Sequence, residues 1–534
     1  MFSGRRAIQK MSNPRSPKRI FIYGPPGSGK STLGEQLSRE LSLSYLDLDK
    51  RIVNKSGMDI PSIFNNEGEE KFRNIESREL NSAINEGVQV IALGGGALLD
   101  KSNRSFVEKE GTVICLHSPL NVLIERLKKD NNKRPLVSLN LESQLTELMD
   151  HRKSHYASFS TQLDSSKFDL SQICDQAQKI IGMFRVYGEG YDYDVRVNPG
   201  GIDLLGEKLR NRGFLGPVCI VSDQNVARYY MERAIASVNA SGYSVNKVVV
   251  PPGEENKTIK TVNQIWEGFL NSNLERNSTV VALGGGVIGD LAGFAAATYK
   301  RGIRWVIVPT SLLAMVDASL GGKTGADLSY GKNLIGSFHH PGYILVDPET
   351  LKTLPVEEIR NGLAETVKHG IIADPDLFYM CRTGIDKLEF EWFNLISSSM
   401  KVKIKVIQKD PYEKGERAVL NLGHSLGHAI ESASSYSIKH GEAVSIGMVT
   451  AARISEKLGI GESGIEDTIS STLNTLGLSV KIPESLDRKK IKLALGVDKK
   501  RAAGKLRAVL PIKIGEVRWG VKIDDEEFLK EGGI

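Results

Sequence analysis

Cysteine is scarce in this sequence, and the four cysteines that occur stand far apart. Cys115, Cys174, Cys219 and Cys381 form no CxxC pair, which excludes a disulfide framework and a cysteine-type zinc site as organising features. No apolar run approaches the roughly 18 residues of a membrane-spanning helix, and the N-terminus has no apolar signal segment. These absences predict a cytoplasmic protein without a membrane partner.

An excess of one charge is also missing from most of the chain. Lysine and arginine total 70 and aspartate and glutamate 64, which gives a net charge of +6. Six basic side chains and no acid fall within residues 1–19, so the rest is neutral, and no nucleic-acid partner is expected. We expect residues 1–17 to be a disordered basic tail. The composition favours such a tail over an organelle transit peptide.

With 534 residues the chain is too long for one domain of about 150 residues. Apolar runs predict strands at residues 20–23, 88–93, 112–116, 218–222, 247–250, 279–283 and 305–308, with helical patterns between them. From about residue 355 the pattern is helical until a strand-like run at 506–510. The sequence therefore predicts three units, of which the first two are α/β and the third is mainly helical. The boundary between the first two units, the seam, is expected within residues 172–189.

A glycine-rich loop follows the first strand. Gly24-Pro-Pro-Gly-Ser-Gly-Lys-Ser31 fits the GxxxxGK[ST] pattern and leads into a helix, so its backbone N–H groups are expected to bind the phosphates of a nucleoside triphosphate. Lys30 would reach the β- and γ-phosphates, and Ser31 would hold Mg²⁺. Asp47 and Asp49 end the next apolar stretch, and in a strand they would share one face.

The motifs after this loop occur in a specific order. Asp47-Leu-Asp49 is followed by Ile63-Phe64, Gly68-Glu69, Phe72-Arg73, Glu76, Gly94–Gly96, Arg134-Pro-Leu, Arg152 and Tyr156. This series resembles shikimate kinase over residues 18–182. The resemblance implies transfer of the ATP γ-phosphate to the 3-hydroxyl of shikimate, which yields shikimate 3-phosphate.

The same resemblance implies roles for individual residues. Asp47 lies on the Mg²⁺ side, Asp49 binds the shikimate hydroxyls and orients or deprotonates the nucleophile, and Arg134 in a mobile lid stabilises the transferring phosphoryl group. The implied catalytic residues are Lys30, Asp49 and Arg134. The implied ATP and Mg²⁺ ligands are Gly27, Ser28, Gly29, Lys30, Ser31, Thr32, Asp47 and Arg134. The implied shikimate ligands are Asp49, Arg73, Gly94, Gly95, Gly96 and Arg152, of which the two arginines clamp the carboxylate.

Polar residues also end the strands of the second unit. They are Asp223 and Asn225, the stretch 254–257, the turn Gly284-Gly-Gly-Val-Ile-Gly-Asp290, and Thr310 with Ser311. Because parallel strands end at one edge of a sheet, these groups are expected to converge where α/β proteins bind ligands. The glycine turn does not match the GxGxxG fingerprint. The polar residues at the neighbouring strand ends nevertheless strengthen the prediction of a ligand site at this edge.

Histidines of the third unit indicate a metal site. His424 and His428 stand four residues apart, on one face of a helix, and His440 follows, while Glu365 and Lys368 occur upstream. Three imidazole or carboxylate ligands with an open position are typical of a catalytic zinc-type site. Spacing alone favours His424 and His428 as the ligand pair.

Residues 185–534 resemble 3-dehydroquinate synthase. The resemblance is carried by the runs 281–347, 364–370 and 403–444. It implies NAD⁺, a divalent metal (Zn²⁺ or Co²⁺), and conversion of 3-deoxy-D-arabino-heptulosonate 7-phosphate to 3-dehydroquinate plus phosphate. It also implies Glu365, His424 and His440 as the metal ligands, with His428 contacting substrate and aiding proton movement.

The synthase resemblance implies two further residue sets. The NAD⁺ contacts are Asp223, Asn225, Glu254, Lys257, Gly286, Val287, Ile288, Gly289, Asp290, Thr310, Ser311, Lys323, Lys332 and Thr353. The substrate contacts are Arg301, Lys323, Lys332, Asn333, Lys368, Lys403, Arg417, Asn421 and His428, plus one of Lys499 and Lys500. Among these, Arg301, Lys323, Lys368, Lys403 and His428 are implied to be catalytic.

The expected fold class is α/β. A P-loop kinase domain (18–182) precedes a Rossmann-like NAD-binding domain (183–354) and a mainly helical metal-binding domain (355–534). We expect a bifunctional shikimate-pathway enzyme with small-molecule substrates. We expect no channelling between its two active sites, and a homodimer that forms through the synthase half. One alternative is a P-loop small-molecule kinase joined to a metal- and NAD-dependent polyol dehydrogenase. Another is a nucleotide-sensing regulator with dead sites, against which Lys30, Asp49, Glu365 and His440 argue.

Overall fold

The computed structural model describes residues 19–130, 141–328, 330–411, 415–501 and 507–534. It divides into two compact units, Met1–Arg185 (unit 1) and Val186–Ile534 (unit 2). The boundary falls inside the predicted seam, close to the expected division after residue 182. The predicted tail, residues 1–17, and the predicted lid residue Arg134 lie outside the described residues.

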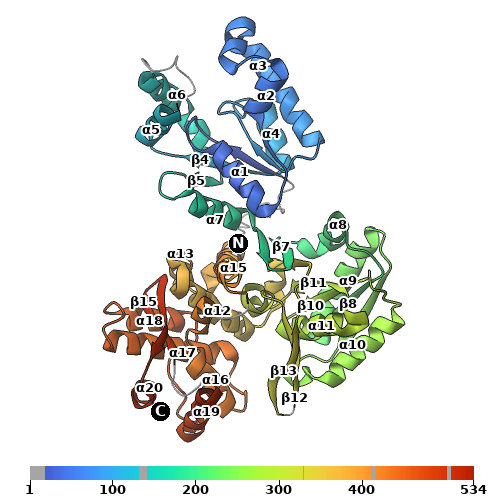
Figure 1. Cartoon of the computed structure of the whole chain (residues 1–534), viewed down its shortest axis with the longest axis vertical. Coiled ribbons are helices and arrows are strands. Elements are labelled where there is room, and N and C mark those ends of the chain that lie inside the picture. Colours follow the sequence, from blue (N-terminus) through green and yellow to red (C-terminus); the bar gives the residue numbers. More distant parts are fainter. Residues whose placement is uncertain (1–18, 131–140, 329, 412–414, 502–506) are drawn as a thin grey trace, which may run out of the picture. The chain divides into compact units, whose positions relative to one another are not determined.

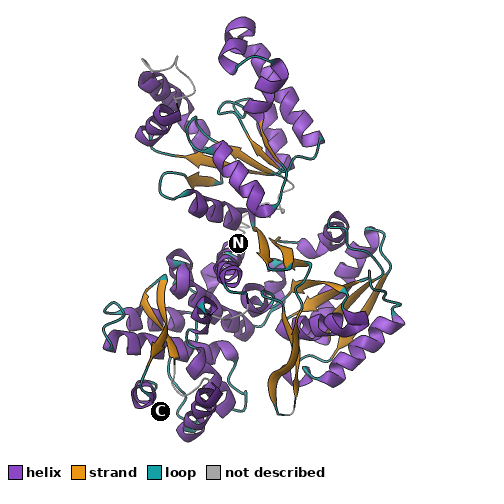
Figure 2. Cartoon of the chain, in the orientation of Figure 1, coloured by secondary structure: helices purple, strands orange, loops and turns teal. Residues whose placement is uncertain are grey.

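Unit 1 is an α/β unit around a parallel sheet (Figures 1 and 2). Among its described residues the strand order is β2-β3-β1-β4-β5. Its elements are β1 (Ile20–Tyr23), α1 (Lys30–Leu41), β2 (Tyr45–Asp47), α2 (Leu48–Ser56), α3 (Ile60–Asn85), β3 (Val90–Ala92), α4 (Lys101–Glu110), β4 (Thr112–His117), α5 (Leu120–Asp130), α6 (Leu141–Ala157), β5 (Gln162–Asp164) and α7 (Leu170–Ile181).

The first strand shows how this sheet positions the loop that follows it. Successive side chains of a strand point to opposite faces, and here Phe21 and Tyr23 enter one buried cluster while Ile20 and Ile22 enter another. β1 is therefore buried on both faces, between β3 and β4. The chain leaves it at Gly24, at the carboxyl edge of the sheet, where the predicted phosphate loop begins.

Unit 2 begins with a second, larger sheet. Its described strands have the order β6-β7-β14-β11-β10-β8-β9. The elements of this part are β6 (Met183–Gly188), β7 (Tyr191–Val197), η2 (Gly201–Leu204), α8 (Leu205–Asn211), β8 (Val218–Asp223), α9 (Gln224–Ala240), β9 (Val245–Val250), η3 (Glu254–Asn256), α10 (Ile259–Asn271), β10 (Thr279–Gly284), α11 (Gly286–Thr298), η4 (Tyr299–Arg301), β11 (Arg304–Pro309), η5 (Ala314–Ala318), β12 (Lys323–Leu328), β13 (Gly331–Phe338), β14 (Tyr343–Val346) and η6 (Pro348–Thr353).

The remainder of unit 2 is mainly helical, as predicted from about residue 355. Its elements are α12 (Val356–Ala373), α13 (Pro375–Cys381), α14 (Ile385–Leu388), α15 (Trp392–Lys409), η7 (Glu416–Asn421), α16 (His424–Ala433), α17 (His440–Lys457), α18 (Ile465–Thr475), α19 (Arg488–Arg501), β15 (Arg507–Lys513), β16 (Glu516–Lys522) and α20 (Asp525–Glu531). None of the described helices is both long enough and apolar enough to cross a membrane.

One feature of unit 2 is absent from the predicted elements. Residues 323–338 form the antiparallel hairpin β12–β13, in which Gly325 faces Gly336 across the two strands. A Cβ on either glycine would lie only 2.5 or 2.3 Å from a backbone oxygen of the opposite strand. The glycines therefore serve close strand pairing in this hairpin, whose strands are not among those predicted from apolar runs.

Candidate active sites

The predicted phosphate loop lies between β1 and α1, as the sequence indicates. Its glycines Gly24, Gly27 and Gly29 have φ values of 137°, 76° and 91°, a region that favours residues without a side chain. Gly29 caps α1 without a side-chain hydrogen bond, so the first N–H groups of the helix face the loop. Lys30 Nζ donates to Pro25 O at 3.0 Å, and burial lowers the pKa of Lys30.

The two carboxylates after the loop are placed differently from the prediction. β2 ends at Asp47, and Asp49 lies in the first turn of α2, so the premise that both belong to one strand is wrong. Ser31 Oγ donates to Asp47 Oδ2 at 2.6 Å. Asp49 and Asp47 nevertheless both act electrostatically on Lys30, because the strand-to-helix turn brings both carboxylates to the loop.

The triple-glycine turn after β3 brings the predicted shikimate ligands together. A Cβ on Gly94 would lie 2.7 Å from Asp49 Oδ1, and one on Gly96 would lie 2.5 Å from Arg73 Nη2. The carbonyl of Gly95 accepts a hydrogen bond from Arg152 Nη1 at 3.1 Å. Each glycine of the turn therefore adjoins a different one of the predicted ligands.

Arg73 is held by acids in this structure. Arg73 Nη1 donates to Glu76 Oε2 at 2.7 Å, and Arg73 Nη2 lies 3.2 Å from Glu69 Oε1. Glu76 is buried, and its Oε1 has no hydrogen-bond partner. Burial raises the pKa of Glu76 against the opposing effect of Arg73. Glu76 is thus a buried acid beside the predicted site.

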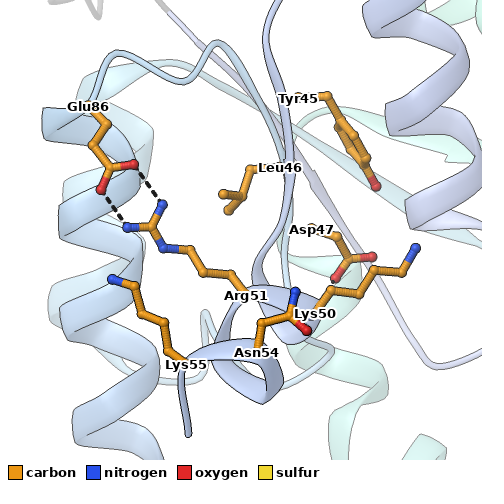
Figure 3. A pocket seen from close by; sticks show the side chains of 8 residues that line it. All are labelled: Tyr45, Leu46, Asp47, Lys50, Arg51, Asn54, Lys55 and Glu86. Atoms are coloured by element: carbon orange, nitrogen blue, oxygen red, sulfur yellow. Dashed lines mark hydrogen bonds and ion pairs between the residues drawn. The ribbon is translucent and has the colours of Figure 1, made fainter. Parts of the chain in front are cut away.

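Figure 3 shows a pocket of unit 1 that lies beside this site. Its lining residues are Tyr45, Leu46, Asp47, Lys50, Arg51, Asn54, Lys55 and Glu86. The side chain of Arg51 points to Glu86 (Figure 3), and its Nη1 donates to Glu86 Oε2 at 2.8 Å. Of the predicted site residues, Asp47 is the one in this lining, so the pocket borders the side on which Mg²⁺ is predicted to bind.

In unit 2 the predicted strand ends do converge. β9, β8, β10 and β11 are adjacent and parallel, so their carboxyl ends share one edge. α11 begins there, capped by Gly285 without a side-chain hydrogen bond. Asp223 instead caps its own helix α9, because it accepts from the N–H groups of Asn225 and Val226. Thr353 shares a hydrogen bond of 2.6 Å with the hydroxyl of Tyr230.

A buried lysine joins three elements at this edge. Lys257 Nζ lies 2.5 Å from Asp290 Oδ2 of α11 and donates to Asn333 Oδ1 of β13 at 2.6 Å. Near the same hairpin tip, Lys332 Nζ lies 3.1 Å from Glu254 Oε1. Lys257, Asp290, Asn333, Lys332 and Glu254 therefore form one cluster.

The structure gathers three predicted metal ligands from three helices. Glu365 of α12, His424 of α16 and His440 of α17 each offer a donor atom, and these atoms lie within 4.8 Å of one another. Glu365 Oε1 is 3.2 Å from His440 Nε2 and 3.6 Å from His424 Nε2. His428, the spacing-based choice, packs its ring 5.2 Å from that of His424 and belongs to a second possible group with Glu431 and His440.

Hydrogen bonds orient both histidines of this cluster. His424 Nδ1 is 3.1 Å from Leu422 O, and His440 Nδ1 is 3.2 Å from Glu431 Oε2. A ring nitrogen that donates to an oxygen leaves the other nitrogen as the ligand atom. In both rings that other atom is Nε2, which faces Glu365.

Electrostatics differ between these two histidines. Burial and the ammonium of Lys368 lower the pKa of His424 to about 3. Burial opposes protonation of His440 as well, but the carboxylates of Glu365 and Glu431 outweigh it and raise its pKa to about 10. Burial would raise the pKa of Glu365, yet Lys368 and the two histidines hold it well below its usual range.

Asp317 forms the next part of the site. Its Oδ1 and its backbone carbonyl accept hydrogen bonds from Lys403 Nζ at 2.7 and 2.6 Å. Asp317 Oδ1 also lies 3.8 Å from Nε2 of the buried His369, whose Nδ1 is 2.7 Å from Ser399 Oγ. Burial opposes ionisation of Asp317, but Lys403 outweighs it, so the pKa of Asp317 is about 2.

The predicted substrate residues do not all meet. Arg417 adjoins Gly321, whose Cβ would lie 3.1 Å from Arg417 Nη2. Asn421, at the end of η7, is exposed. Lys323 pairs with Phe338, which places it five residues from Asn333 along β13, about 16 Å at the rise of a strand. The hairpin thus separates two residues that the resemblance assigns to one ligand. The side chains of Lys499 and Lys500 lie outside the described part of the chain.

Arg301 is the most distant of the predicted residues. It precedes β11, whose carboxyl end leads to Thr310 and Ser311, so it lies at the opposite edge of the sheet, beyond about 16 Å of strand. Its side chain is exposed. Within the described residues its side chain makes no hydrogen bond or ion pair.

Some residues that adjoin the sites were not found from the sequence. Glu431 orients His440, and its position three residues after His428, on the same helix face, was the available signal. Tyr23 donates to Gly95 O of the triple-glycine turn, and His155 contacts the Tyr23 hydroxyl. The sequence gave no indication that either residue adjoins a site, because each occupies an ordinary strand or helix position.

Comparisons with known proteins agree with the two units. Residues 26–181 match the family model "Shikimate kinase", residues 247–361 match "3-dehydroquinate synthase N-terminal", and residues 362–501 match "3-dehydroquinate synthase C-terminal". The 3-dehydroquinate synthase of Nostoc punctiforme is 44% identical over 332 residues, which are 61% of this chain and 92% of that protein. The chain belongs to the 3-dehydroquinate synthase family. It combines this synthase with a shikimate kinase domain, so both enzymatic activities are supported.

Two solved structures resemble the two parts. A 2-deoxy-scyllo-inosose synthase complexed with carbaglucose-6-phosphate, NAD⁺ and Co²⁺ is 25% identical, with a TM-score of 0.59, and the match covers 65% of this chain and 98% of that one. A shikimate kinase from Acinetobacter baumannii in complex with shikimate is 32% identical, with a TM-score of 0.29, and the match covers 31% of this chain and 92% of that one.

Proposed function

We propose that unit 1 binds MgATP on the loop Gly24–Ser31 and shikimate on the turn Gly94–Gly96. The turn carries this proposal, because it adjoins Asp49, Arg73 and Arg152 at once. Ser31 and Asp47, joined by a hydrogen bond, would hold Mg²⁺, which neutralises phosphate charge when bound. ATP and shikimate added to the purified chain should yield shikimate 3-phosphate. A folded sample that forms none would refute the kinase assignment.

Each side chain then has a defined task in phosphoryl transfer. Asp49 accepts the proton of the 3-hydroxyl, since it lies beside both the glycine turn and Lys30. Lys30 moves from Pro25 O to the transferring phosphate. Arg73 and Arg152 exchange their present partners, Glu76 and Gly95 O, for the two oxygens of the carboxylate, which suits the forked guanidinium group.

We propose that unit 2 holds a divalent metal on Glu365, His424 and His440. The donor set fits such an ion, since two imidazole Nε2 atoms are turned toward one buried carboxylate. The ion would also take the place of the proton that Glu365 and Glu431 hold on His440, because metal binding releases protons from its ligands. When the chain is stripped of its bound ion with a chelator, freed of the chelator and assayed with Mg²⁺ added back, 3-dehydroquinate formation should be abolished and shikimate phosphorylation should stay intact.

We further propose that NAD⁺ binds at the carboxyl edge of the larger sheet. The uncapped N-terminus of α11, flanked by Gly284–Gly286, fits a diphosphate. When bound there, NAD⁺ would supply a hydride acceptor and donor, and the metal on Glu365, His424 and His440 would supply polarisation of the hydroxyl that is oxidised. Lys368 and Lys403 hold positive charge beside the metal ligands and Asp317, where they bind the anionic substrate. NADH should therefore not accumulate during turnover, and its net release would favour the polyol dehydrogenase alternative.

We propose that two chains associate through unit 2 and that Arg301 of one copy completes the site of the other. Its exposed position at the opposite edge of the sheet supports this assignment. Arg301→Ala and His424→Ala chains, each inactive as synthase alone, should regain about a quarter of wild-type activity when mixed under exchange, since half of random two-fold dimers carry one intact site. No regain in a mixture shown to form mixed dimers would contradict it.

A reducing compartment such as the cytoplasm is the proposed location. All four cysteines are buried. Burial raises the pKa of the Cys115, Cys219 and Cys381 thiols to about 12, so they are poor nucleophiles. Microscopy of a tagged full-length chain tests the location, and recovery from a membrane-bounded compartment would contradict it.

A further inference from the structure

One backbone carbonyl of unit 1 has more donors than lone pairs. Gly95 O accepts hydrogen bonds from Tyr156 Oη at 2.7 Å, Arg152 Nη1 at 3.1 Å and Tyr23 Oη at 3.2 Å. A carbonyl oxygen has two lone pairs, so these three donors compete for two positions. Arg152 is the one charged donor among the three and the one with a proposed substrate task.

Tyr23 has a second neighbour that controls its proton. Its hydroxyl oxygen lies 3.0 Å from Nε2 of His155, and the two rings meet edge to face, 5.8 Å apart. The phenol has one proton to give. When His155 carries its proton on Nε2 it donates to Tyr23, and the proton of Tyr23 is then directed to Gly95 O.

The surroundings keep this pair in place. Tyr23 is fully buried, and burial raises its pKa, so the phenol keeps its proton. Burial and two nearby guanidinium groups, Arg104 and Arg152, lower the pKa of His155. The ring of Phe159 packs edge to face on His155 at 5.3 Å, under Arg104. His155 is therefore a neutral, sterically fixed ring beside the hydroxyl.

We propose that Tyr23, oriented by His155, is a positioning residue of the kinase site. Tyr23 and Tyr156 together fill both lone pairs of Gly95 O, which frees Arg152 for the carboxylate of the acceptor. Without the Tyr23 hydroxyl, Arg152 would keep one lone pair of Gly95 O and would bind the carboxylate less readily. This inference rests on the kinase function proposed above and extends it to a residue outside the predicted ligand set.

The test uses the full-length chain and the variant Tyr23→Phe, which removes one hydroxyl and keeps the ring. We expect the KM for shikimate to rise about three- to tenfold, the effect of one hydrogen bond, while the KM for ATP and kcat stay within about twofold. Tyr45→Phe is the matched control. It removes a hydroxyl that donates to Ser31 O at 3.1 Å, on the nucleotide side, and should leave the KM for shikimate unchanged.

His155 variants test whether the histidine acts through the tyrosine. His155→Phe should raise the KM for shikimate, and His155→Gln, whose amide can still donate to the phenol, should restore most of the wild-type value. In a Tyr23→Phe background His155→Phe should add nothing, because coupled residues are not additive. Additive effects of the two substitutions would refute the inference that His155 acts through Tyr23.

The outcomes separate this inference from the function on which it rests. A wild-type chain that phosphorylates no shikimate would overturn both. An active wild type with an unchanged KM for shikimate in Tyr23→Phe would overturn the positioning role alone. A uniform fall in kcat with unchanged KM values, or an equal rise in both KM values, would show a merely structural effect and would also overturn it.

Discussion

The two sites of this chain are assembled in different ways. In unit 1 the proposed shikimate ligands lie around a single turn, Gly94–Gly96, at one edge of one sheet. In unit 2 the proposed ligands come from a sheet edge, a hairpin and three helices, and Arg301 stands apart from all of them.

This difference shows what each site needs in order to form. The unit 1 site combines residues near strand ends with Arg73 of α3 and Arg152 of α6, so it needs the sheet and two helices that pack against one turn. The unit 2 site forms only when α12, α16 and α17 pack together, because each contributes one donor to Glu365, His424 and His440. Substitutions should therefore act on one site without touching the other.

The largest expected effect is loss of the synthase reaction in His424→Ala. Removing one of three proposed ligands should lower 3-dehydroquinate formation about a thousandfold or more, since the ion supplies several kcal/mol of charge stabilisation. Shikimate phosphorylation on the same preparation should not change. His151→Ala, at an exposed histidine of unit 1, is the control, and an active His424→Ala synthase would refute the ligand assignment.

The next largest effect is expected for Asp49→Asn in unit 1. An amide cannot accept the proton of the 3-hydroxyl, so kcat for shikimate phosphorylation should fall about a hundred- to ten-thousandfold, the range for loss of a general base. Synthase activity should stay at its wild-type value. Asp150→Asn, an exposed position of α6, is the matched control. Retention of more than a tenth of kcat would contradict the role of Asp49.

Many features of both units were predictable from residues that are close in sequence. The loop Gly24–Ser31 and the strand–turn at 281–286 each combine an apolar strand with glycines, and both were placed correctly. The predicted convergence of strand ends also holds, because adjacent parallel strands necessarily end at one edge. The helical pattern after residue 355 begins within a residue of α12.

The predictions that failed concern features that depend on three-dimensional packing. The DxD pair was placed on one strand, but the chain turns into α2 at Asp47, where the carboxylate caps the helix. The hairpin β12–β13 was missed because neither of its strands contains an apolar run. Glu431 was overlooked although it stands three residues after His428 on the same helix face. The Tyr23–His155 pair could not be found, because a hydroxyl that contacts a turn has no spacing rule.

A smaller effect should follow from changing the residue that orients His440. Glu431→Gln keeps the size of the side chain but removes the charge that faces His440 Nδ1. Substituting a residue that hydrogen-bonds to a metal ligand typically lowers metal affinity by about 10- to 100-fold. Titration with Zn²⁺ or Co²⁺ followed by activity should show this weakening, with a near-normal maximum at saturating metal. Glu484→Gln, an exposed position, is the control, and an unchanged metal affinity would contradict the orienting role.

The smallest effect is expected when the two sites are separated. Expressing residues 1–182 and 183–534 as two chains cuts after α7, whose residues Ile173, Ala177 and Ile181 belong to a core of unit 1, and before β6, the first strand of the larger sheet. Each part then keeps its own sheet, only Met183 of that core passes to the second chain, and the two reactions are not consecutive. Both activities should stay within about twofold of the intact chain. A cut inside α7 should instead abolish the kinase alone, because it removes part of that core. Loss of synthase activity after the first cut would show that the two sites depend on each other.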